Sequence, residues 1–427
     1  MTAQQKSYAL PMAIIGALFF IFGFVTWLNS VLIPFLQQVC ELTDFQAYFV
    51  TLAFYISYFV MAIPASAILK KTGFTKGMSL GLGIMAIGSL IFIPAAQIRS
   101  YPLFLVGLFA QGVGLTLLQT ASNPYVTILG PIESAAKRIS IMGICNKIAG
   151  MIGILILVEL LFSDTKTLSA KISTLSGAAL AEELDVLASR VIVPYVVMAV
   201  VLIGLALLVL KAHMPEINPE EDEQPGQAGV KSKTSVFDYP HLVLGVICIF
   251  VYVGVEVIAI DTIGLYGQYQ GFDLNTASKF GIYSLIALTV GYLIGIVVIP
   301  KYLSQRNALM VSAVMGFIFT IGALLTDGWL SIGFIVLLSF AHALMWPSIW
   351  PLAINNLGRF TKTGSALLIM GVVGGALLPL VYGALADGSN RQTAYWIALP
   401  CYLYILFYAT KGYRAGQTVL EQRPAGA

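Results

Sequence analysis

Long apolar runs recur along the chain, and their length restricts the fold more than any other feature of the sequence. A helix needs about 20 apolar residues to cross the hydrocarbon core of a bilayer. The chain of 427 residues is 58% hydrophobic and only 10% charged, whereas soluble domains carry about 25% charged residues. Thr43-Asp44-Phe45-Gln46 is typical of a capping box that begins the second run. We therefore expect an all-α membrane protein with 12 transmembrane helices, at about 10–37, 46–69, 77–97, 101–129, 139–162, 191–211, 241–268, 276–300, 307–326, 329–355, 364–386 and 392–412.

The lysines and arginines between the runs predict the orientation of the chain. Sixteen fall on the side of the two termini and six on the opposite side. Cytoplasmic loops of membrane proteins carry an excess of these residues. We therefore expect a multi-pass protein of the cytoplasmic (inner) membrane with both termini in the cytoplasm. The first run is expected to be a retained span, because no small-residue cleavage site follows it as in a signal peptide.

One long polar stretch divides the apolar runs into two groups of six. It lies at about 212–238, and its acidic and Gly/Pro-containing composition is typical of a solvated linker. We predict three parts: an N-terminal six-helix bundle at 1–211, a cytoplasmic linker at 212–238 and a C-terminal six-helix bundle at 239–427. Leu129-Gly130 and Leu357-Gly358 begin similar segments 228 residues apart, which favours a parallel duplication with a substrate site between the halves. The loop at about 163–190 has a helix-like patch without a predicted role.

Charged residues inside the runs are candidates for function, because they are costly in a membrane. Lys147 lies in the fifth run, and Glu256 and Asp261 lie in the seventh. Glu159 is so close to the end of its run that we expect it to be solvated. The acids could bind a driving cation, hydrogen-bond a substrate or pair with Lys147. A static ion pair, or Asp261 at the membrane interface, would be the structural alternative.

Uncharged amides and tryptophans form a second group of candidates. An amide offers donors and an acceptor together, as the hydroxyls of a neutral sugar require, although buried amides also join helices. Trp346 and Trp350 share a helix face four residues apart, where they could cover a sugar ring opposite Trp27 or form part of an interfacial belt. Pro347 and Pro351 predict a kink or an unwound segment there. The amides are Asn29, Gln119, Asn123, Asn146, Asn355 and Asn356.

The chain contains several specific motifs. They include Leu42-Thr43-Asp44-Phe45-Gln46-Ala47, Tyr252-Val253-Gly254 and, most specifically, Asn123-Pro124-Tyr125-Val126-Thr127 with Leu129-Gly130-Pro131. With these motifs the chain resembles the fucose permease and glucose/galactose permease branch of the major facilitator superfamily. The resemblance covers essentially all the spans. It implies a major facilitator fold of two six-helix bundles, alternating access, and import of a monosaccharide driven by a cation.

Departures from the family pattern concern the charged positions. Ser30 and Gln119 stand where the fucose permease pattern has the acids that are linked to proton coupling, and Lys147 follows Asn146 where the family has a serine. Gly254-Val255-Glu256 matches the glucose/galactose branch, whereas Asp261 is additional. We hypothesise that Lys147 occupies the place of the coupling cation, or gates it by pairing with Glu256 or Asp261.

The sequence as a whole predicts a secondary active transporter for a hexose or an N-acetylhexosamine, and not an enzyme. Substrate-binding candidates are Asn29, Gln119, Asn123, Asn146, Glu256, Trp346 and Trp350; Lys147, Glu256 and Asp261 are candidates for cation coupling or gating. We expect no cofactor, Na⁺ or H⁺ as the coupling ion, no metal site, no nucleic-acid partner and a monomer. An uncoupled sugar facilitator or exchanger is the alternative, and a membrane sugar sensor is the alternative of another class.

Overall fold

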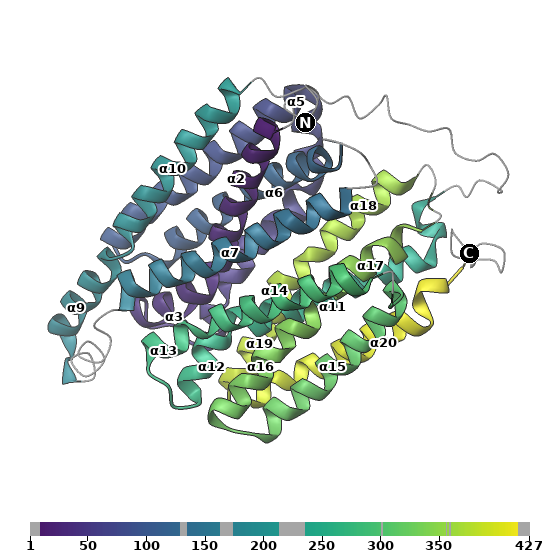
Figure 1. Ribbon diagram of the computed structural model, residues 1–427. Coiled ribbons are helices and arrows are strands. Elements are labelled where there is room, and N and C mark those ends of the chain that lie inside the picture. The colour runs from purple at the N-terminus through teal and green to yellow at the C-terminus, as the bar shows by residue number, and fades with distance from the viewer. Residues whose placement is uncertain are drawn as a thin grey trace.

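The helices of the computed structural model account for nearly all of the residues it describes, which are 9–128, 135–162, 174–212, 235–299, 302–355, 357 and 360–416 (Figure 1). The α-helices of the N-terminal half are α2 (Ala9–Trp27), α3 (Asn29–Val39), α4 (Asp44–Ala47), α5 (Phe49–Gln97), α6 (Tyr101–Ile128), α7 (Ala135–Phe162), α9 (Gly177–Ser189) and α10 (Ile192–Lys211). Those of the C-terminal half are α11 (Pro240–Asp261), α12 (Ile263–Tyr269), α13 (Leu274–Ser278), α14 (Phe280–Val298), α15 (Gln305–Leu325), α16 (Gly328–His342), α17 (Met345–Ile354), α18 (Thr361–Met370), α19 (Gly374–Gly388) and α20 (Ala398–Thr410). Short 3₁₀ helices are η2 (Val236–Asp238), η4 (Gly371–Val373), η5 (Thr393–Ile397) and η6 (Gly412–Arg414).

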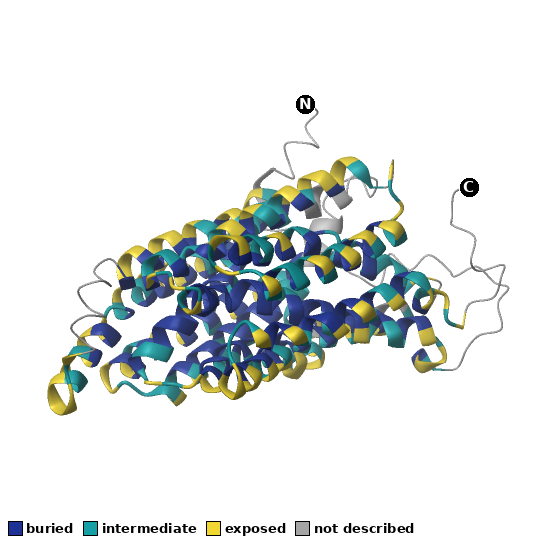
Figure 2. Ribbon diagram, turned by 90° about the horizontal axis from the view of Figure 1, so that it is seen from below, coloured by how far each residue is buried: buried dark blue, intermediate teal, exposed yellow. Residues whose placement is uncertain are grey.

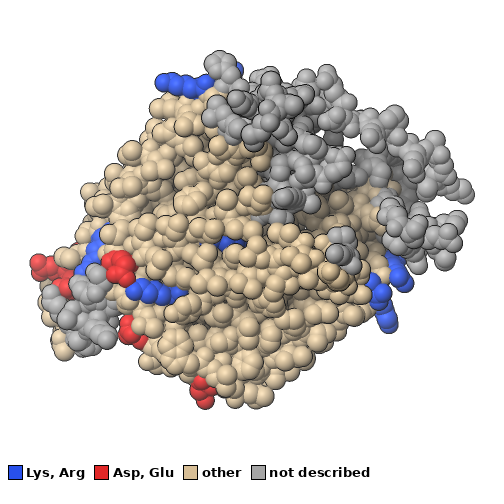
Figure 3. Space-filling model, in the orientation of Figure 1, with Lys and Arg blue, Asp and Glu red and all other residues tan. Residues whose placement is uncertain are grey.

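Twelve helical segments among the described residues are long and apolar enough to cross a membrane. On the face drawn in Figure 3, charged side chains gather near the ends of the molecule, and the band between them is almost free of charge. The hydrocarbon core of a bilayer accounts for this distribution, because aliphatic side chains that face lipid have no unfavourable free energy of contact with water. The prediction of an all-α membrane protein with 12 spans is confirmed. Spans 2 and 3 both belong to α5. The chain turns between them at Gly73, which adopts a φ of 74°.

The helices of the two halves lie side by side, with α5 and α10 at the upper left of Figure 1 and α15 and α20 at the lower right. Buried residues run along the middle of the bundle and exposed ones cover its flanks (Figure 2). The halves contact each other through α7 and α14, and through α19 and α5. The predicted linker falls mostly outside the described residues, as do Leu129-Gly130 and Gly358, so the domain boundaries and the duplication remain predictions.

Several spans are interrupted, and the interruptions of span 1 and span 10 lie beside candidate residues. Span 1 is divided at Leu28, between α2 and α3. Span 10 is divided at Ala343 and Leu344, between α16 and α17. Proline lacks an N–H, and its ring clashes with the carbonyl four residues earlier. Pro347 acts in this way on Ala343, which accounts for the break that the sequence predicted.

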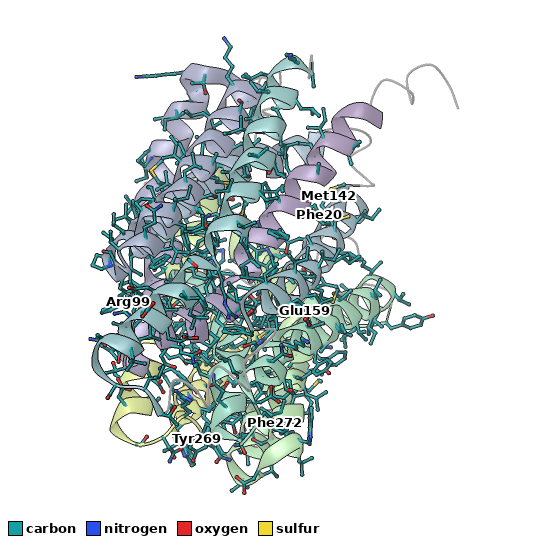
Figure 4. The ribbon with its side chains drawn as sticks, turned by 90° about the vertical axis from the view of Figure 1, so that its left-hand side faces the viewer. Phe20, Arg99, Met142, Glu159, Tyr269 and Phe272 are labelled. Atoms are coloured by element: carbon teal, nitrogen blue, oxygen red, sulfur yellow. The ribbon has the colours of Figure 1, made fainter. Side chains whose placement is uncertain are left out.

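The end of the bundle opposite the termini, here called the distal end, carries short capped segments. The predicted capping box is confirmed: the Thr43 hydroxyl accepts from the Gln46 N–H, and the Gln46 side chain accepts from the Thr43 N–H. The helix-like patch of the 163–190 loop forms α9. Glu159 is solvated as expected, with a side chain that is 60% exposed. Its Oε1 accepts from Lys279 Nζ at 2.7 Å, which joins the two halves where Figure 4 labels Glu159.

Candidate functional site

A tryptophan, an asparagine and a lysine form a compact polar cluster inside the N-terminal half. Trp27 Nε1 donates to Asn146 Oδ1 at 3.0 Å, and Lys147 Nζ donates to the same oxygen at 3.3 Å. The Asn146 amide nitrogen in turn donates to the Phe19 carbonyl at 3.4 Å. Lys147 Nζ also lies 4.6 Å from the centroid of the Trp27 ring. At that distance the ring face attracts a cation.

Two glycines bring α2 and α7 close enough for these contacts. A Cβ on Gly23 would overlap the backbone carbonyl of Asn146, and a Cβ on Gly150 would overlap the ring of Trp27. Close helix approach through small residues is the usual way in which helices pack in membranes. Span 1 and span 5 therefore hold Trp27, Asn146 and Lys147 in a fixed relation to one another.

The C-terminal half faces this cluster with aromatic and acidic groups. Lys147 Nζ lies 5.8 Å from the ring centroid of Tyr292 on α14. Its ammonium also interacts electrostatically with the carboxylate of Glu256 on α11. Among the described residues the two charged groups form no direct ion pair. Lys147 and Glu256 are both only half-buried. Opposite charges from the two halves therefore interact without a direct contact.

The tryptophan pair of span 10 continues the site along the C-terminal half. Trp346 and Trp350 stack with ring centroids 5.4 Å apart and an interplanar angle of 27°. Tyr252 lies one helical turn before Glu256, and its ring centroid is 6.4 Å from that of Trp346. Both tryptophans are half-buried. A continuous aromatic surface thus leads from Glu256 to Trp350.

The other predicted amides are placed differently. Gln119 on α6 is half-buried and lies beside the hydroxyl of Tyr58 on α5. Asn29 is fully buried next to the break in span 1, and neither its amide nitrogen nor its amide oxygen has a hydrogen-bond partner among the described residues. Asn355 is exposed at the end of α17. The side chain of Asn123 and all of Asn356 lie outside the described part of the chain.

Asp261 is separate from the Lys147 cluster. Its side chain is fully buried at the end of α11, and both carboxylate oxygens lack a hydrogen-bond partner within the described structure. It interacts electrostatically with Glu256 and with Tyr48 and Tyr55 of the N-terminal half. Asp261 is thus enclosed by protein at the end of α11, and its depth in the membrane stays a prediction.

A network at the distal end, here called the latch, also joins the halves. It consists of Asp44, Gln37, Asp387 and Arg391. The Arg391 guanidinium donates to both carboxylate oxygens of Asp44, at 2.8 Å each, and to the Leu265 carbonyl at 3.0 Å. Asp387 accepts from the Asp44 and Phe45 N–H groups at 2.9 Å each, which caps α4 from the opposite half.

The sequence did not identify the latch as a site. It placed Asp44 in a capping box and Asp387 at the end of a span, whereas the partner Arg391 lies 347 residues from Asp44. No local pattern links residues so far apart. Among the described residues, no group of three or more His, Cys, Asp or Glu side chains could hold a metal ion.

The chain matches the family model of the Major Facilitator Superfamily over residues 15–381. It is 33% identical over 418 residues to a glucose/galactose transporter of Brucella abortus, covering 96% of each chain. The L-fucose-proton symporter of Escherichia coli is 29% identical over 411 residues, covering 95% of this chain and 94% of the relative.

Solved structures match over a similar length. The crystal structure of the transporter FucP in the outward conformation has a TM-score of 0.70 and 28% sequence identity, covering 94% of this chain and 98% of that chain. The inward-facing, occupied bacterial homologue of the lysosomal transporter Spinster has a TM-score of 0.68 with both chains fully covered. At 15% identity this second match supports the fold alone.

Proposed function

Because the chain belongs to the Major Facilitator Superfamily, we propose that it imports a hexose or an N-acetylhexosamine by alternating access, with a cation as the co-transported species. The chain is a sugar-type transporter and not an enzyme, in keeping with its relatives. The named relatives act on glucose, galactose or fucose. We propose the identity of the sugar, the coupled ion and the residues that bind them.

The observation that carries the proposal is the convergence of polar and aromatic groups from both halves on one place. Lys147, Asn146 and Trp27 come from the N-terminal half, and Glu256 and Tyr292 come from the C-terminal half. A group bound between Lys147 and Glu256 would contact both halves at once. Such a position is required of a substrate around which two bundles rock.

The chemistry of these groups suits a neutral sugar. Glu256 accepts hydrogen bonds, Lys147 donates them, and the Asn146 amide nitrogen has one N–H beyond the one bonded to Phe19, so that hydroxyl groups of either polarity find a partner. The Trp346–Trp350 pair offers an apolar face of the kind that covers the C–H face of a sugar ring. The breadth of a stacked tryptophan pair also leaves room for an N-acetyl group, which keeps N-acetylhexosamine among the candidates.

The contacts between the halves at the distal end, together with the partial exposure of the central residues, support an inward-facing state. At the distal end the latch and the Lys279–Glu159 ion pair hold the halves together. The central residues Lys147, Glu256, Trp346 and Trp350 nevertheless remain partly exposed. With both termini in the cytoplasm, as the Lys/Arg distribution predicts, the distal end faces the outside and the central groups are reached from the cytoplasm.

An uncoupled facilitator is the competing function. It is favoured by Ser30 and Gln119, which are neutral where the fucose permease pattern has acids. Cation coupling is favoured by Glu256 and Asp261, which leave two acids on α11, and by the named proton symport of a relative. A coupled transporter accumulates sugar above the outside concentration when an ion gradient is imposed, whereas a facilitator only equilibrates it.

Purified protein in liposomes tests the proposal by uptake and counterflow of labelled glucose, galactose, fucose and N-acetylglucosamine, with imposed Na⁺ or proton gradients. We expect Trp350→Ala and Glu256→Gln to lower uptake at least tenfold. Trp396→Ala and Asp185→Asn are matched controls, since Trp396 is 58% exposed and Asp185 is 59% exposed and pairs with Arg99 within its own half. If no monosaccharide exchanges in the wild type, or if Glu256→Gln transports normally with unchanged affinity, the proposed site is wrong.

A further inference from the structure

Asp261 is a carboxyl group whose surroundings suit a bound proton better than a negative charge. Its side chain has 0% exposure, and neither oxygen has a hydrogen-bond partner among the described residues. An ionised carboxylate that is buried without a partner is destabilised far more than a neutral carboxyl group. In this conformation, with the latch closed, Asp261 is therefore expected to carry a proton.

The titratable groups that face Asp261 reinforce this assignment. Glu256 lies five residues earlier on the same helix, and Tyr48 and Tyr55 approach from the N-terminal half. Glu256 is acidic and the tyrosines are neutral at ordinary pH, so none of them compensates a negative charge. Lys147 interacts with Glu256 and not with Asp261. The cation that contacts the segment after Asp261 is Arg391 of the latch.

Arg391 contacts the segment that follows Asp261, but its guanidinium is bound elsewhere. One of its N–H groups donates to the carbonyl of Leu265, which lies four residues after Asp261. Four residues are about one helical turn, or about 5–6 Å along the axis. The rest of the guanidinium is held by Asp44 of the opposite half. If the halves separate at the distal end, Asp44 moves away with its half, while Arg391 and Asp261 stay together in theirs.

We propose that Asp261 is the proton-binding group of the transport cycle, and that Arg391 exchanges Asp44 for the ionised Asp261 when the distal end opens. This inference rests on the proposed transport function, and it specifies the coupled ion and the switch. The Arg391–Leu265 contact and the unpartnered Asp261 carboxyl carry it. Neither residue matches the positions at which the related pattern has its coupling acids.

The proposed step moves one proton and no other group. With the distal end open, ionised Asp261 pairs with Arg391; a proton from the outside water binds the carboxylate and releases the guanidinium. Arg391 is then free to pair with Asp44, which closes the distal end and buries the neutral carboxyl group. The proton leaves to the cytoplasm by way of Glu256, which is half-buried at the central site and interacts with Asp261.

The first test compares Asp261→Asn with Asp185→Asn in liposomes that carry an imposed proton gradient; the Asp185 side chain is 59% exposed and pairs with Arg99 of its own half. We expect Asp261→Asn to retain sugar counterflow, which needs no net proton movement, and to lose at least tenfold of its gradient-driven accumulation. Asp185→Asn should retain both. Accumulation at the wild-type level by Asp261→Asn would overturn the proposal. Wild-type protein without any counterflow would instead contradict the transport function itself, so that the two failures are distinguishable.

The second test separates the exchange of Arg391 from the mere loss of the latch. Arg391→Gln and Asp44→Asn both break the ion pair, but only the second leaves Arg391 free for Asp261. The pH at which gradient-driven uptake falls to half should rise by about one unit in Arg391→Gln and fall in Asp44→Asn, because a neighbouring cation favours the ionised carboxyl. Shifts in the same direction, or no shift in either variant, would refute the exchange. If Asp261→Asn shows neither counterflow nor sugar-induced thermal stabilisation, Asp261→Glu replaces it and should restore accumulation.

Discussion

Removal of the Arg391 guanidinium should open the distal end of the protein. In Arg391→Gln, Asp44 loses a bidentate partner and the Leu265 carbonyl loses its donor. The bonds to Asp44 link the two halves, so they stabilise the closed arrangement and are absent once the halves separate, whereas the bond to Leu265 lies within the C-terminal half. Asp44 is then left at the interface with Gln37 as its remaining side-chain donor.

The geometry of the pair sets the magnitude of the effect. Removing one partner of a fully buried ion pair costs about 3–5 kcal/mol, whereas exposed pairs contribute below about 1 kcal/mol. The Arg391 side chain is 23% exposed and that of Asp44 is 9% exposed, so we place the loss at about 2–3 kcal/mol. Because about 1.4 kcal/mol corresponds to a factor of ten, the ratio of closed to open molecules should fall about 30- to 150-fold.

Pulsed electron paramagnetic resonance measures this ratio directly. Spin labels on Val186→Cys and Leu325→Cys would report the separation of the halves, in a chain whose native cysteines are replaced; these residues are 53% and 79% exposed, on opposite halves. Arg391→Gln should add a population at longer distance. The control is Arg99→Gln, whose ion pair with Asp185 lies within one half. If the distance distribution of Arg391→Gln equals that of the wild type, the latch does not hold the distal end closed.

Three further outcomes follow from the described contacts. Lys147→Ala should alter the cation dependence of uptake, whereas Lys279→Ala should not; a liposome assay in which the dependence is unchanged would contradict the role of Lys147. Gly23→Ala should lower the free energy of unfolding by about 1–3 kcal/mol through overpacking against α7, whereas Gly83→Ala, with nothing within 4 Å, should be neutral or stabilising in thermal unfolding. Burial raises the pKa of the Cys40 thiol to about 11; because the thiolate is the reactive form, maleimide labelling should speed up about tenfold per pH unit between pH 7 and 10, and a plateau below pH 9 would contradict this.

Features that depend on local chemistry could be predicted from the sequence. The spans follow from the apolar length that a bilayer requires. The capping box at Thr43 follows from hydrogen bonds between residues three apart. The break before Pro347 follows from the missing N–H of proline. Each of these needs only neighbours along the chain, so no knowledge of the packing is required.

Features that depend on which helix faces which could be predicted only in part. The sequence identifies Lys147 and Glu256 as charged residues whose burial in a membrane is energetically costly, and their pairing could be hypothesised from that. The hydrogen bond from Trp27 to Asn146 could not be predicted, because it depends on the packing of α2 against α7. Arg391 is an ordinary loop residue by its sequence context. Its position in the latch results from the approach of α4 to the end of α19, and hydropathy does not encode that approach.

The latch and the central site share one feature: in each, a basic side chain of one half faces an acidic side chain of the other half. Lys147 places a basic group near Glu256, so that a basic side chain of the N-terminal half faces an acidic one of the C-terminal half in the middle of the bundle. At the distal end the signs are reversed, since Asp44 of the N-terminal half meets Arg391 of the C-terminal half. Asp261 lies between these two pairs without a cation of its own. In the proposed cycle, protonation of Asp261 decides whether Arg391 is available to Asp44, and thereby whether the distal end closes over a sugar at the site proposed between Lys147 and Glu256.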